Sequence, residues 1–163
     1  MRFKLLSMFA AMLLLAACES ASDQGNAAAG GGTATGNTQT TRVVPGSSED
    51  FVQNVGDRVF FDFDRSDLKP EARATLERQA AWLKQYSNVR LQIEGHCDER
   101  GSEEYNIALG ARRAQAAKDY LQTLGVAADR MSTISYGKEL PLCTEHTEDC
   151  WEQNRRDHFV VTQ

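Results

Sequence analysis

E-G-H-C-D-E-R-G-S-E-E-Y-N-I-A-L-G-A-R-R-A, residues 94–114, joins the end of a strand to a long helix through a turn of charged residues. A carboxylate in this turn, such as that of Asp98, accepts hydrogen bonds from an ammonium group. The guanidinium of Arg113 and the amides at the helix N-terminus hold a carboxylate. The stretch therefore predicts a site for a small zwitterion that carries both charges on one carbon.

Apolar residues on either side of this stretch alternate between a period of two and a helical period. The pattern predicts strands near residues 59–63, 89–94, 131–136 and 158–162, and helices near residues 70–83, 102–124 and 148–154. Pro70 suits a first helical turn, Ser102 suits an N-cap and Gly125 suits a helix end. The expected fold class is α+β, in the order β-α-β-α-β-α-β, with a small mixed sheet and helices packed on one face.

The long helix is expected to carry two stripes. Asn106, Leu109 and Arg113 are spaced i, i+3 and i+7, which places them on one face. The apolar stripe through Ile107, Ala111 and Ala114 is expected to be a separate face that packs on the core. The first stripe is then free to line a groove.

A second acidic segment follows the first strand, where residues 61–66 read F-D-F-D-R-S. If the first two strands are parallel, this segment and the turn that contains Asp98 leave the sheet at the same edge. We therefore expect Asp64 to join Asp98 and the polar stripe of the helix in one site.

The N-terminus has the order of a secretory signal. Arg2 and Lys4 precede an apolar run of thirteen residues, 5–17, which is too short to span a bilayer. The run ends in L-A-A-C at Cys18, which resembles the bacterial lipobox, so residues 1–17 are expected to be a signal peptide and Cys18 the lipidated first residue. Glu19 follows the lipidated position, where an acidic residue affects sorting to the outer membrane; we expect that Glu19 does not prevent delivery there.

Residues 18–48 are expected to form a flexible tether, because they contain almost no bulky apolar side chain. A coil of about 30 residues has a root-mean-square span of roughly 30 Å. Residues 49–163 are enough for one compact domain. The chain has 23 acidic against 18 basic residues and a net charge of -5, so nucleic acid is not an expected partner.

Three cysteines remain besides Cys18. In an oxidising compartment, Cys143 and Cys150 are expected to form a disulfide, because they close the shortest loop, and Cys97 is expected to remain a free thiol. A zinc site that includes His146 is the alternative, because cysteine and histidine are the ligands that zinc prefers. The disulfide is favoured.

Other residues near the quoted stretch have plainer expected roles. His96 is expected to be a hydrogen-bonded residue at the rim of the site, and Arg112 to lie on a solvated helix face. Arg155 and Arg156 are expected to make structural ion pairs near the last strand.

A further hypothesis is a cell-wall enzyme with Cys97, between His96 and Asp98, as its nucleophile. Consecutive residues on an extended chain point in different directions, so these three side chains are not expected to form a catalytic group.

Five motifs together resemble a known family. They are F-D-F-D from Phe61, G-H-x-D-E-R-G from Gly95, Y-N-x-x-L-G-x-R-R-A from Tyr105, S-Y-G-K-E-x-P from Ser135 and N-R-R from Asn154. With the lipobox before them, these motifs resemble the peptidoglycan-associated lipoproteins, whose domain is the OmpA-like peptidoglycan-binding domain. The resemblance covers residues 58 to about 162. Cys97 departs from it, because the family usually has a small residue there.

The resemblance implies a binding protein and not an enzyme, with no cofactor and no metal. By its motifs, Asp98 and Arg113 correspond to the residues essential for binding diaminopimelate of the peptidoglycan stem peptide, and Asp64, Asn106 and Leu109 to supporting contacts. It also implies an outer-membrane location with the domain facing the periplasm, an anchor in outer-membrane lipid through acylated Cys18, and work with Tol proteins, including a periplasmic β-propeller, in envelope constriction. The alternative is an OmpA-like lipoprotein that anchors a different envelope machine.

Overall fold

The computed structural model describes residues 43–162 of the chain. Two short helical turns, α1 (Ser48–Asp50) and the π-helical η1 (Phe51–Val55), precede the first strand. The remaining elements follow in the order β1 (Arg58–Phe60), α2 (Pro70–Gln85), β2 (Arg90–His96), α3 (Glu103–Thr123), η2 (Ala128–Arg130), β3 (Met131–Gly137), α4 (Glu148–Asn154) and β4 (Arg156–Thr162). The predicted alternation of strands and helices is confirmed.

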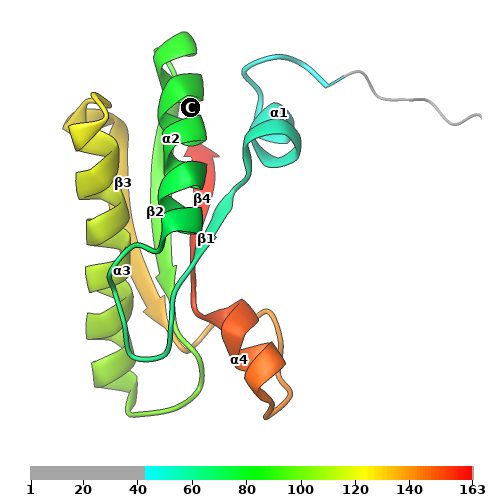
Figure 1. Ribbon diagram of the computed structural model, residues 1–163, viewed down its shortest axis with the longest axis vertical. Helices are drawn as coiled ribbons and strands as arrows, with labels where there is room; N and C mark the ends of the chain where they lie inside the picture. Colours follow the sequence, from blue (N-terminus) through cyan, green and yellow to red (C-terminus); the bar gives the residue numbers. More distant parts are fainter. Residues whose placement is uncertain (1–42, 163) are drawn as a thin grey trace, which may run out of the picture. The chain divides into compact units, whose positions relative to one another are not determined.

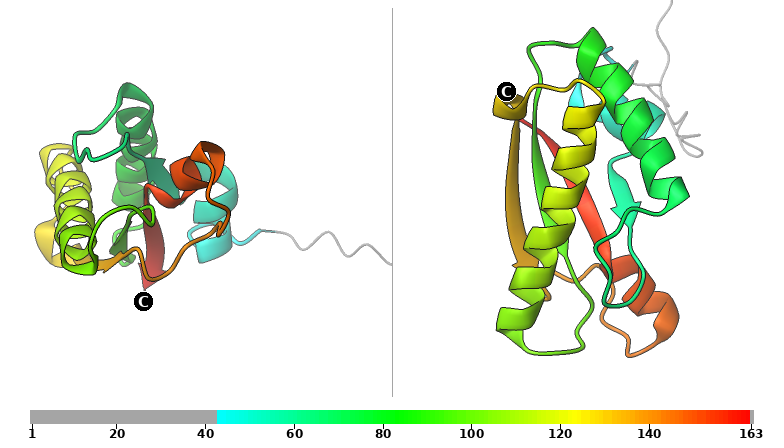
Figure 2. Two further views of the ribbon diagram at one scale, coloured as in Figure 1. Left: turned by 90° about the horizontal axis from the view of Figure 1, so that it is seen from below. Right: turned by 60° about the vertical axis from the view of Figure 1, so that its left-hand side comes forward.

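The four strands form one mixed sheet in the order β1-β4-β2-β3. Strand β4 is antiparallel to both β1 and β2, whereas β2 and β3 are parallel. Strands β1, β2 and β3 therefore point the same way, and their carboxyl ends lie at one edge of the sheet. Helix α4 lies at that edge, and α2 and α3 pack together on one face of the sheet (Figure 1; Figure 2, right).

The three residues predicted to begin or end helices do so. Pro70 occupies the first turn of α2, and the side chain of Ser102 caps α3 by accepting from the amide of Tyr105 at 3.2 Å. Gly125 has φ 90° and ends α3 in the left-handed conformation that favours glycine. These caps fix where α3 begins and therefore which residues follow the turn after β2.

Helix α3 crosses the sheet at a contact between two glycines. A Cβ on Gly95 would lie 2.0 Å from the carbonyl oxygen of Gly110, and a Cβ on Gly110 would lie 2.4 Å from the Oγ of Ser135. Only residues without a side chain allow this approach. The contact fixes the rotation of α3 about its axis and so decides which of its side chains face the sheet.

That rotation corrects the expected stripes. Ile107 is 38% exposed and Ala111 is also exposed, so they do not belong to the core. The polar stripe of Asn106 and Arg113 is buried and continues directly into the apolar one, so α3 has one buried face instead of two. The core between the sheet and the helices contains Phe51, Val59, Phe61, Leu76, Leu83, Leu91, Ile93, Ala114, Ala117, Leu121 and Phe159.

Strand β1 is shorter than the alternation of its apolar residues predicts. Val59 and Phe61 are buried, but pairing with β4 ends at Phe60, and Phe63 is 55% exposed. The chain turns away from the sheet after Phe61. Phe63 and Asp64 are thereby released into the loop that faces the start of α3.

Candidate functional site

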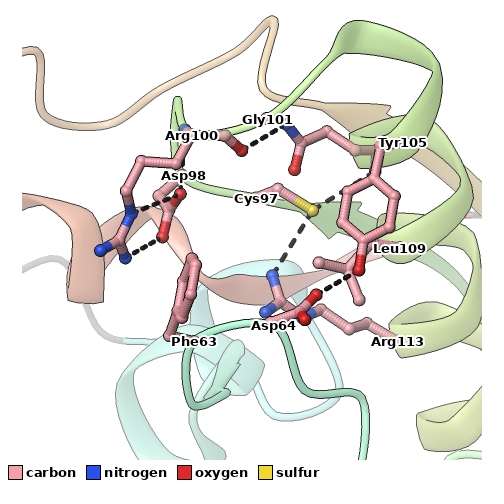
Figure 3. Close-up of a pocket in the computed structure, with 10 residues that line it drawn as sticks. Phe63, Asp64, Cys97, Asp98, Arg100, Gly101, Tyr105, Leu109 and Arg113 are labelled. Atoms are coloured by element: carbon pink, nitrogen blue, oxygen red, sulfur yellow. Dashed lines mark hydrogen bonds and ion pairs between the residues drawn. The ribbon is translucent and has the colours of Figure 1, made fainter.

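A pocket of about 160 Å³ lies at the edge where β1 and β2 end (Figure 3). The loop after β1, the loop after β2 and the first three turns of α3 enclose it. All five residues predicted to bind ligand line it: Asp64, Asp98, Asn106, Leu109 and Arg113. The structure therefore brings together residues that are up to 49 positions apart in the sequence, because β1 and β2 point the same way.

Asp98 is the most heavily hydrogen-bonded carboxylate of the pocket, and it is only 4% exposed. It accepts from Arg100 through the backbone amide at 3.1 Å, Nε at 3.2 Å and Nη2 at 2.6 Å. Nη1 of Arg155 lies 3.3 Å from its Oδ2. Burial raises the pKa of Asp98, but the hydrogen bonds from the two arginines outweigh burial and hold this pKa below its usual value, so the carboxylate stays ionised.

Arg113 is fully buried, and its guanidinium joins three segments of backbone. Nε donates to the carbonyl of Arg65 at 2.8 Å, Nη1 to that of His96 at 2.8 Å and Nη2 to that of Asp62 at 3.1 Å. Burial lowers its pKa, yet an arginine remains protonated at neutral pH. Arg113 thus holds the loops after β1 and β2 in place and presents its positive charge at the base of the pocket.

Asp64 is the exposed carboxylate of the pocket, and it accepts from the hydroxyl of Tyr105. Its φ of 57° makes it the one residue other than glycine with positive φ within residues 43–162. Such a conformation is uncommon outside glycine, asparagine and aspartate and is found at functional sites. It turns the carboxylate toward α3 and away from the sheet edge.

Asn106 and Leu109 provide the helix side of the pocket. The amide nitrogen of Asn106 donates to the carbonyls of Arg100 at 2.9 Å and Ser102 at 3.1 Å, which uses both of its N–H groups. The side-chain oxygen of Asn106 remains for a ligand N–H. Leu109 is 5% exposed and gives the pocket an apolar wall.

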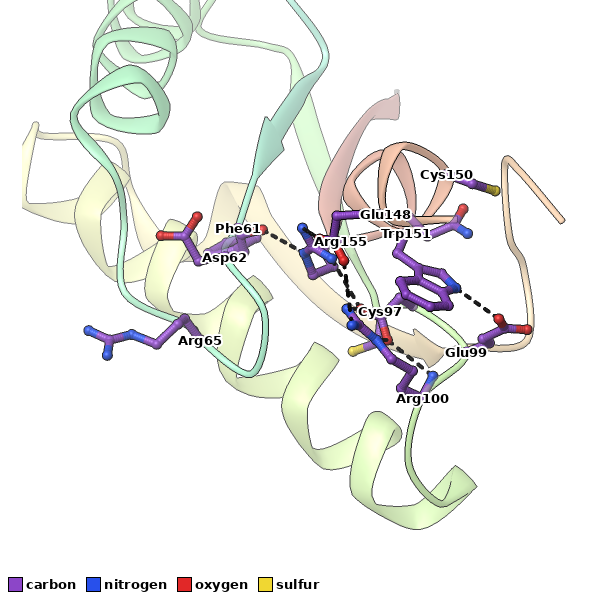
Figure 4. A network of polar contacts seen from close by, with 12 residues as sticks. Phe61, Asp62, Arg65, Cys97, Glu99, Arg100, Glu148, Cys150, Trp151 and Arg155 are labelled. Carbon is purple, nitrogen blue, oxygen red and sulfur yellow. Dashed lines mark hydrogen bonds and ion pairs between the residues drawn. The ribbon is translucent and has the colours of Figure 1, made fainter. Parts of the chain in front are cut away.

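Sequence reasoning did not identify Arg100, Phe63 and Trp151 as members of the site. The guanidinium carbon of Arg100 lies 4.0 Å from the ring centroid of Phe63 and 4.2 Å from that of Trp151. Figure 4 shows Trp151 on α4 beside Arg100, with Glu148 and Arg155 next to them. The position of Arg100 two residues after Asp98 is a signal that could have identified it, whereas no local signal identifies Trp151.

The expected role of His96 is wrong. His96 is 3% exposed, and neither ring nitrogen has a hydrogen-bond partner in the part of the chain that the structure describes. Burial, followed by the nearby charges of Arg156, His158 and Arg58, lowers its pKa to about 4, so the ring is neutral at pH 7. His96 is a buried neutral residue that stacks near Tyr136, with the ring centroids 5.5 Å apart. It is not a rim residue.

The two arginines of the N-R-R motif behave differently from one another. Arg155 makes the expected ion pairs, with Asp98 at 3.3 Å and Glu148 at 2.8 Å. Arg156 makes none within residues 43–162 and instead donates to the carbonyls of Asn154 and Leu140, so the ion pair expected for it is wrong. Arg112 lies exposed on α3, as expected.

The cysteines separate into a pair and a single thiol. Cys143 and Cys150 form a disulfide, with their Cα atoms 5.3 Å apart, and Cys97 is free and buried. The thiol of Cys97 donates to the carbonyl of Asn106 at 3.3 Å. Burial raises the pKa of Cys97 to about 11, so little thiolate exists at neutral pH, which disfavours the hypothesis of a nucleophile.

The signal segment, Cys18 and the tether as far as residue 42 lie outside the described residues. Within residues 43–162, no helix has both the length and the apolar character needed to cross a bilayer. Across the same residues, no three His, Cys, Asp or Glu side chains gather where they could hold a metal ion.

Comparisons with known proteins agree with this geometry. A family model described as "OmpA family" matches residues 60–155. The peptidoglycan-associated lipoprotein of Rhizobium meliloti (strain 1021) is 53% identical over 149 residues, which cover 91% of this chain and 82% of the relative. The crystal structure of the peptidoglycan-associated lipoprotein from Burkholderia pseudomallei superposes with a TM-score of 0.67 at 36% identity and covers 71% of this chain and all of that one.

A more distant likeness extends to the C-terminal domain of Helicobacter pylori MotB. It has a TM-score of 0.61 at 20% identity and covers 66% of this chain and 84% of that domain. At this identity, the likeness concerns the fold alone.

Proposed function

Since this chain belongs to the OmpA family, we propose that it is an outer-membrane lipoprotein that binds peptidoglycan non-covalently through diaminopimelate, without catalysis. The observation that carries the proposal is the charge content of one small pocket. Two carboxylates, Asp64 and Asp98, and two guanidiniums, Arg100 and Arg113, line the same 160 Å³. This balance suits a zwitterion better than a ligand with a single charge.

The free end of diaminopimelate in a stem peptide has an ammonium and a carboxylate on one carbon. In our proposal its ammonium lies between Asp98 and Asp64, whose oxygens accept its three N–H bonds together with the carbonyl of Asn106. Its carboxylate faces the positive charges of Arg100 and Arg113, and Arg113 has one N–H left beyond its bonds to the three carbonyls and the Sγ of Cys97. Leu109 packs against the methylene carbons.

The size of the pocket fits this assignment. Pockets for drug-sized ligands enclose about 300–1,000 Å³, and this one is smaller. It suits the charged end of one amino-acid side chain and leaves the glycan and the rest of the stem peptide outside. Specificity would therefore come from the zwitterion.

The remainder of the proposal concerns the N-terminal segment and the partners. Lipid on Cys18 would anchor residues 18–48 as a tether, and residues 49–163 would reach the wall from the outer membrane. As the resemblance of its motifs implies, the protein would work with Tol proteins, including the periplasmic β-propeller, in envelope constriction at division. Fatty-acid labelling of a Cys18→Ser variant tests the anchor, since incorporation of label would contradict it.

Sedimentation of the full chain with isolated peptidoglycan tests the binding. We expect Asp98→Ala to lose roughly 2 to 5 kcal/mol of binding free energy, because it removes one partner of a buried charge pair. Arg112→Ala is the matched control, because Arg112 lies exposed beside the site and contributes nothing to its lining. Unchanged sedimentation of the Asp98→Ala variant would refute the assignment.

The alternative, an OmpA-like lipoprotein that anchors a different envelope machine, shares the pocket and differs in its partners. Affinity capture of the full chain from a cross-linked envelope fraction separates the two. Recovery of Tol proteins supports the proposal, and recovery of another envelope complex in their place supports the alternative.

A further inference from the structure

Arg100 is held between two aromatic rings at the mouth of the pocket. Its guanidinium carbon lies 4.0 Å from the ring centroid of Phe63 and 4.2 Å from that of Trp151. Figure 3 shows Phe63 beneath Arg100, and Figure 4 shows Trp151 close to it. Contacts to two rings restrict the plane of a guanidinium and keep its edge available for hydrogen bonds.

The hydrogen bonds of Arg100 leave one edge of the guanidinium lightly used. Nε and Nη2 bind the two oxygens of Asp98. Among residues 43–162, Nη1 has only Glu148 as a partner, at 3.5 Å, and the side chain of Glu148 is 60% exposed. An exposed ion pair at this distance is weak, so another carboxylate can replace Glu148 at small cost.

Arg113 is much less available to a ligand than Arg100. It has no exposed surface, and each of its three nitrogens already donates to a backbone carbonyl. A carboxylate held by two parallel N–H bonds needs two free donors on one edge of the guanidinium. Arg113 has one, whereas the end edge of the Arg100 guanidinium offers one N–H of Nη1 and the second N–H of Nη2, beside the exposed and replaceable Glu148.

Trp151 is itself fixed by the disulfide-closed segment, residues 143–150. It directly follows Cys150, and its Nε1 donates to Glu99 at 2.8 Å. The side-chain Nδ2 of Asn154 donates to the backbone carbonyl of Cys143 at 2.7 Å. This hydrogen bond is a second link, besides the disulfide, between the start of the segment and α4. The position of the indole therefore depends on the disulfide, and the position of Arg100 depends on the indole.

We propose that Arg100 receives the carboxylate at the zwitterionic end of the ligand, and that Trp151, held by the disulfide-closed segment, is the positioning residue that keeps Arg100 in place. This inference rests on the proposed function and adds to it the residue that distinguishes diaminopimelate from lysine. The ammonium remains with Asp98 and Asp64, so the Asp98–Arg100 pair presents opposite charges to the two groups on one carbon.

The test is a ratio of two affinities. The full chain is titrated calorimetrically with two muropeptides that are identical except for diaminopimelate in one and lysine in the other. Lysine lacks the second carboxylate, so the wild-type chain should prefer diaminopimelate about tenfold or more, the value of a hydrogen bond to a charged group. Arg100→Gln should bring the ratio close to one, and Arg112→Gln should leave it unchanged.

Two further changes separate selection of the carboxylate from a loss of structure. Arg100→Lys keeps a cation between the rings but loses the planar fork, so the ratio should fall while the melting temperature stays near that of the wild type. Trp151→Leu and the double change Cys143→Ser with Cys150→Ser should each reduce the ratio several-fold. A general loss of stability would weaken both affinities together and leave the ratio as it was.

The outcomes are distinct. A wild-type chain that binds both muropeptides equally overturns the role of Arg100 and leaves non-covalent binding of peptidoglycan standing. A wild-type chain that binds neither overturns both. A ratio that survives Arg100→Gln in a folded protein also overturns the inference, and a ratio that survives Trp151→Leu overturns the positioning role.

Discussion

The two halves of the buried face of α3 differ in polarity. Toward the N-terminus this face presents Asn106 and Arg113 to the loops after β1 and β2, and toward the C-terminus it presents Ala117 and Leu121 to the apolar core. All four side chains are almost fully inaccessible to solvent. One continuous face of one helix thus serves a binding pocket at one end and hydrophobic packing at the other.

The difference shows that burial on α3 is supported in two separate ways. Leu121 is stable in the interior because its apolar surface leaves water. Arg113 is stable there because backbone carbonyls accept from each of its nitrogens. The polar half should therefore respond to the loss of hydrogen-bond partners and to pH, and the apolar half to the loss of volume.

The largest effect is expected at the polar half. Arg113→Leu leaves the carbonyls of Arg65, His96 and Asp62 without this donor, so the free energy of unfolding should fall by about 3 to 5 kcal/mol. Urea denaturation measures it. Arg113→Lys should recover part of the loss, and a fall of less than about 1 kcal/mol for Arg113→Leu would contradict the role of this residue in holding the two loops.

At the apolar half, Leu121→Ala should lower the free energy of unfolding by about 3 kcal/mol, because it opens a cavity among fully buried neighbours. The affinity of the folded protein for a diaminopimelate muropeptide should stay unchanged. Ile107→Ala is the control on the opposite face and should cost less than about 1 kcal/mol. Equal losses at Leu121 and Ile107 would restore the two-stripe arrangement that the structure corrects.

His96 sharpens the comparison, because it is buried and its ring nitrogens make no hydrogen bond within residues 43–162; the nearest carboxylate, that of Glu94, lies 4.0 Å from Nε2. Its pKa in the folded protein is about 4, below the usual 6.5, so the folded state favours the neutral ring. Stability from this residue is complete above pH 6.5 and is lost as the pH falls toward 4, by about 3 kcal/mol in total. Asp157, whose pKa burial raises, changes stability in the opposite direction across this range.

A comparison of variants isolates the histidine from Asp157. Thermal unfolding of the wild-type chain and of His96→Gln from pH 7 to pH 4.5 should show the wild type losing about 2 kcal/mol or more relative to the variant. Parallel pH profiles for the two proteins would show that His96 does not titrate in this range.

The smallest effect is expected for Arg112, the neighbour of Arg113 on the exposed side of α3. Its guanidinium lies 5.9 Å from the ring centroid of Tyr105, and the residue is exposed. Arg112→Ala should change the free energy of unfolding by less than about 0.5 kcal/mol and the affinity by less than about threefold. A larger change in affinity would place Arg112 in the site.

The sequence predicts the elements and five lining residues of the pocket because both follow from local patterns. Periods of two and of 3.6 separate strands from helices, and residues after two parallel strands meet at one edge. The rotation of α3 does not follow from such patterns, because the contact between Gly95 and Gly110 sets it. Ile107 and Ala111 are apolar yet exposed for that reason.

The cluster around Arg100 could not be predicted for a related reason. Phe63 and Arg100 come from two loops and Trp151 from α4. These segments are distant in the sequence, and only the positions of the chain turns bring them together. The absence of hydrogen bonds at His96 has the same origin. A histidine two residues before an aspartate suggests a polar rim, whereas the side chain of His96 is buried beside Tyr136 on the face of the sheet away from Gly95 and α3.

The central claim is that the polar half of α3, with the loops that face it, binds the zwitterionic end of diaminopimelate. Backbone amide NMR of the full chain during titration with a diaminopimelate muropeptide tests it most directly. The account predicts saturable shifts confined to residues 62–66 and 96–113, with residues 114–124 unchanged, and their loss in Asp98→Ala. Shifts centred on the apolar half, or binding that Asp98→Ala leaves intact, would contradict it.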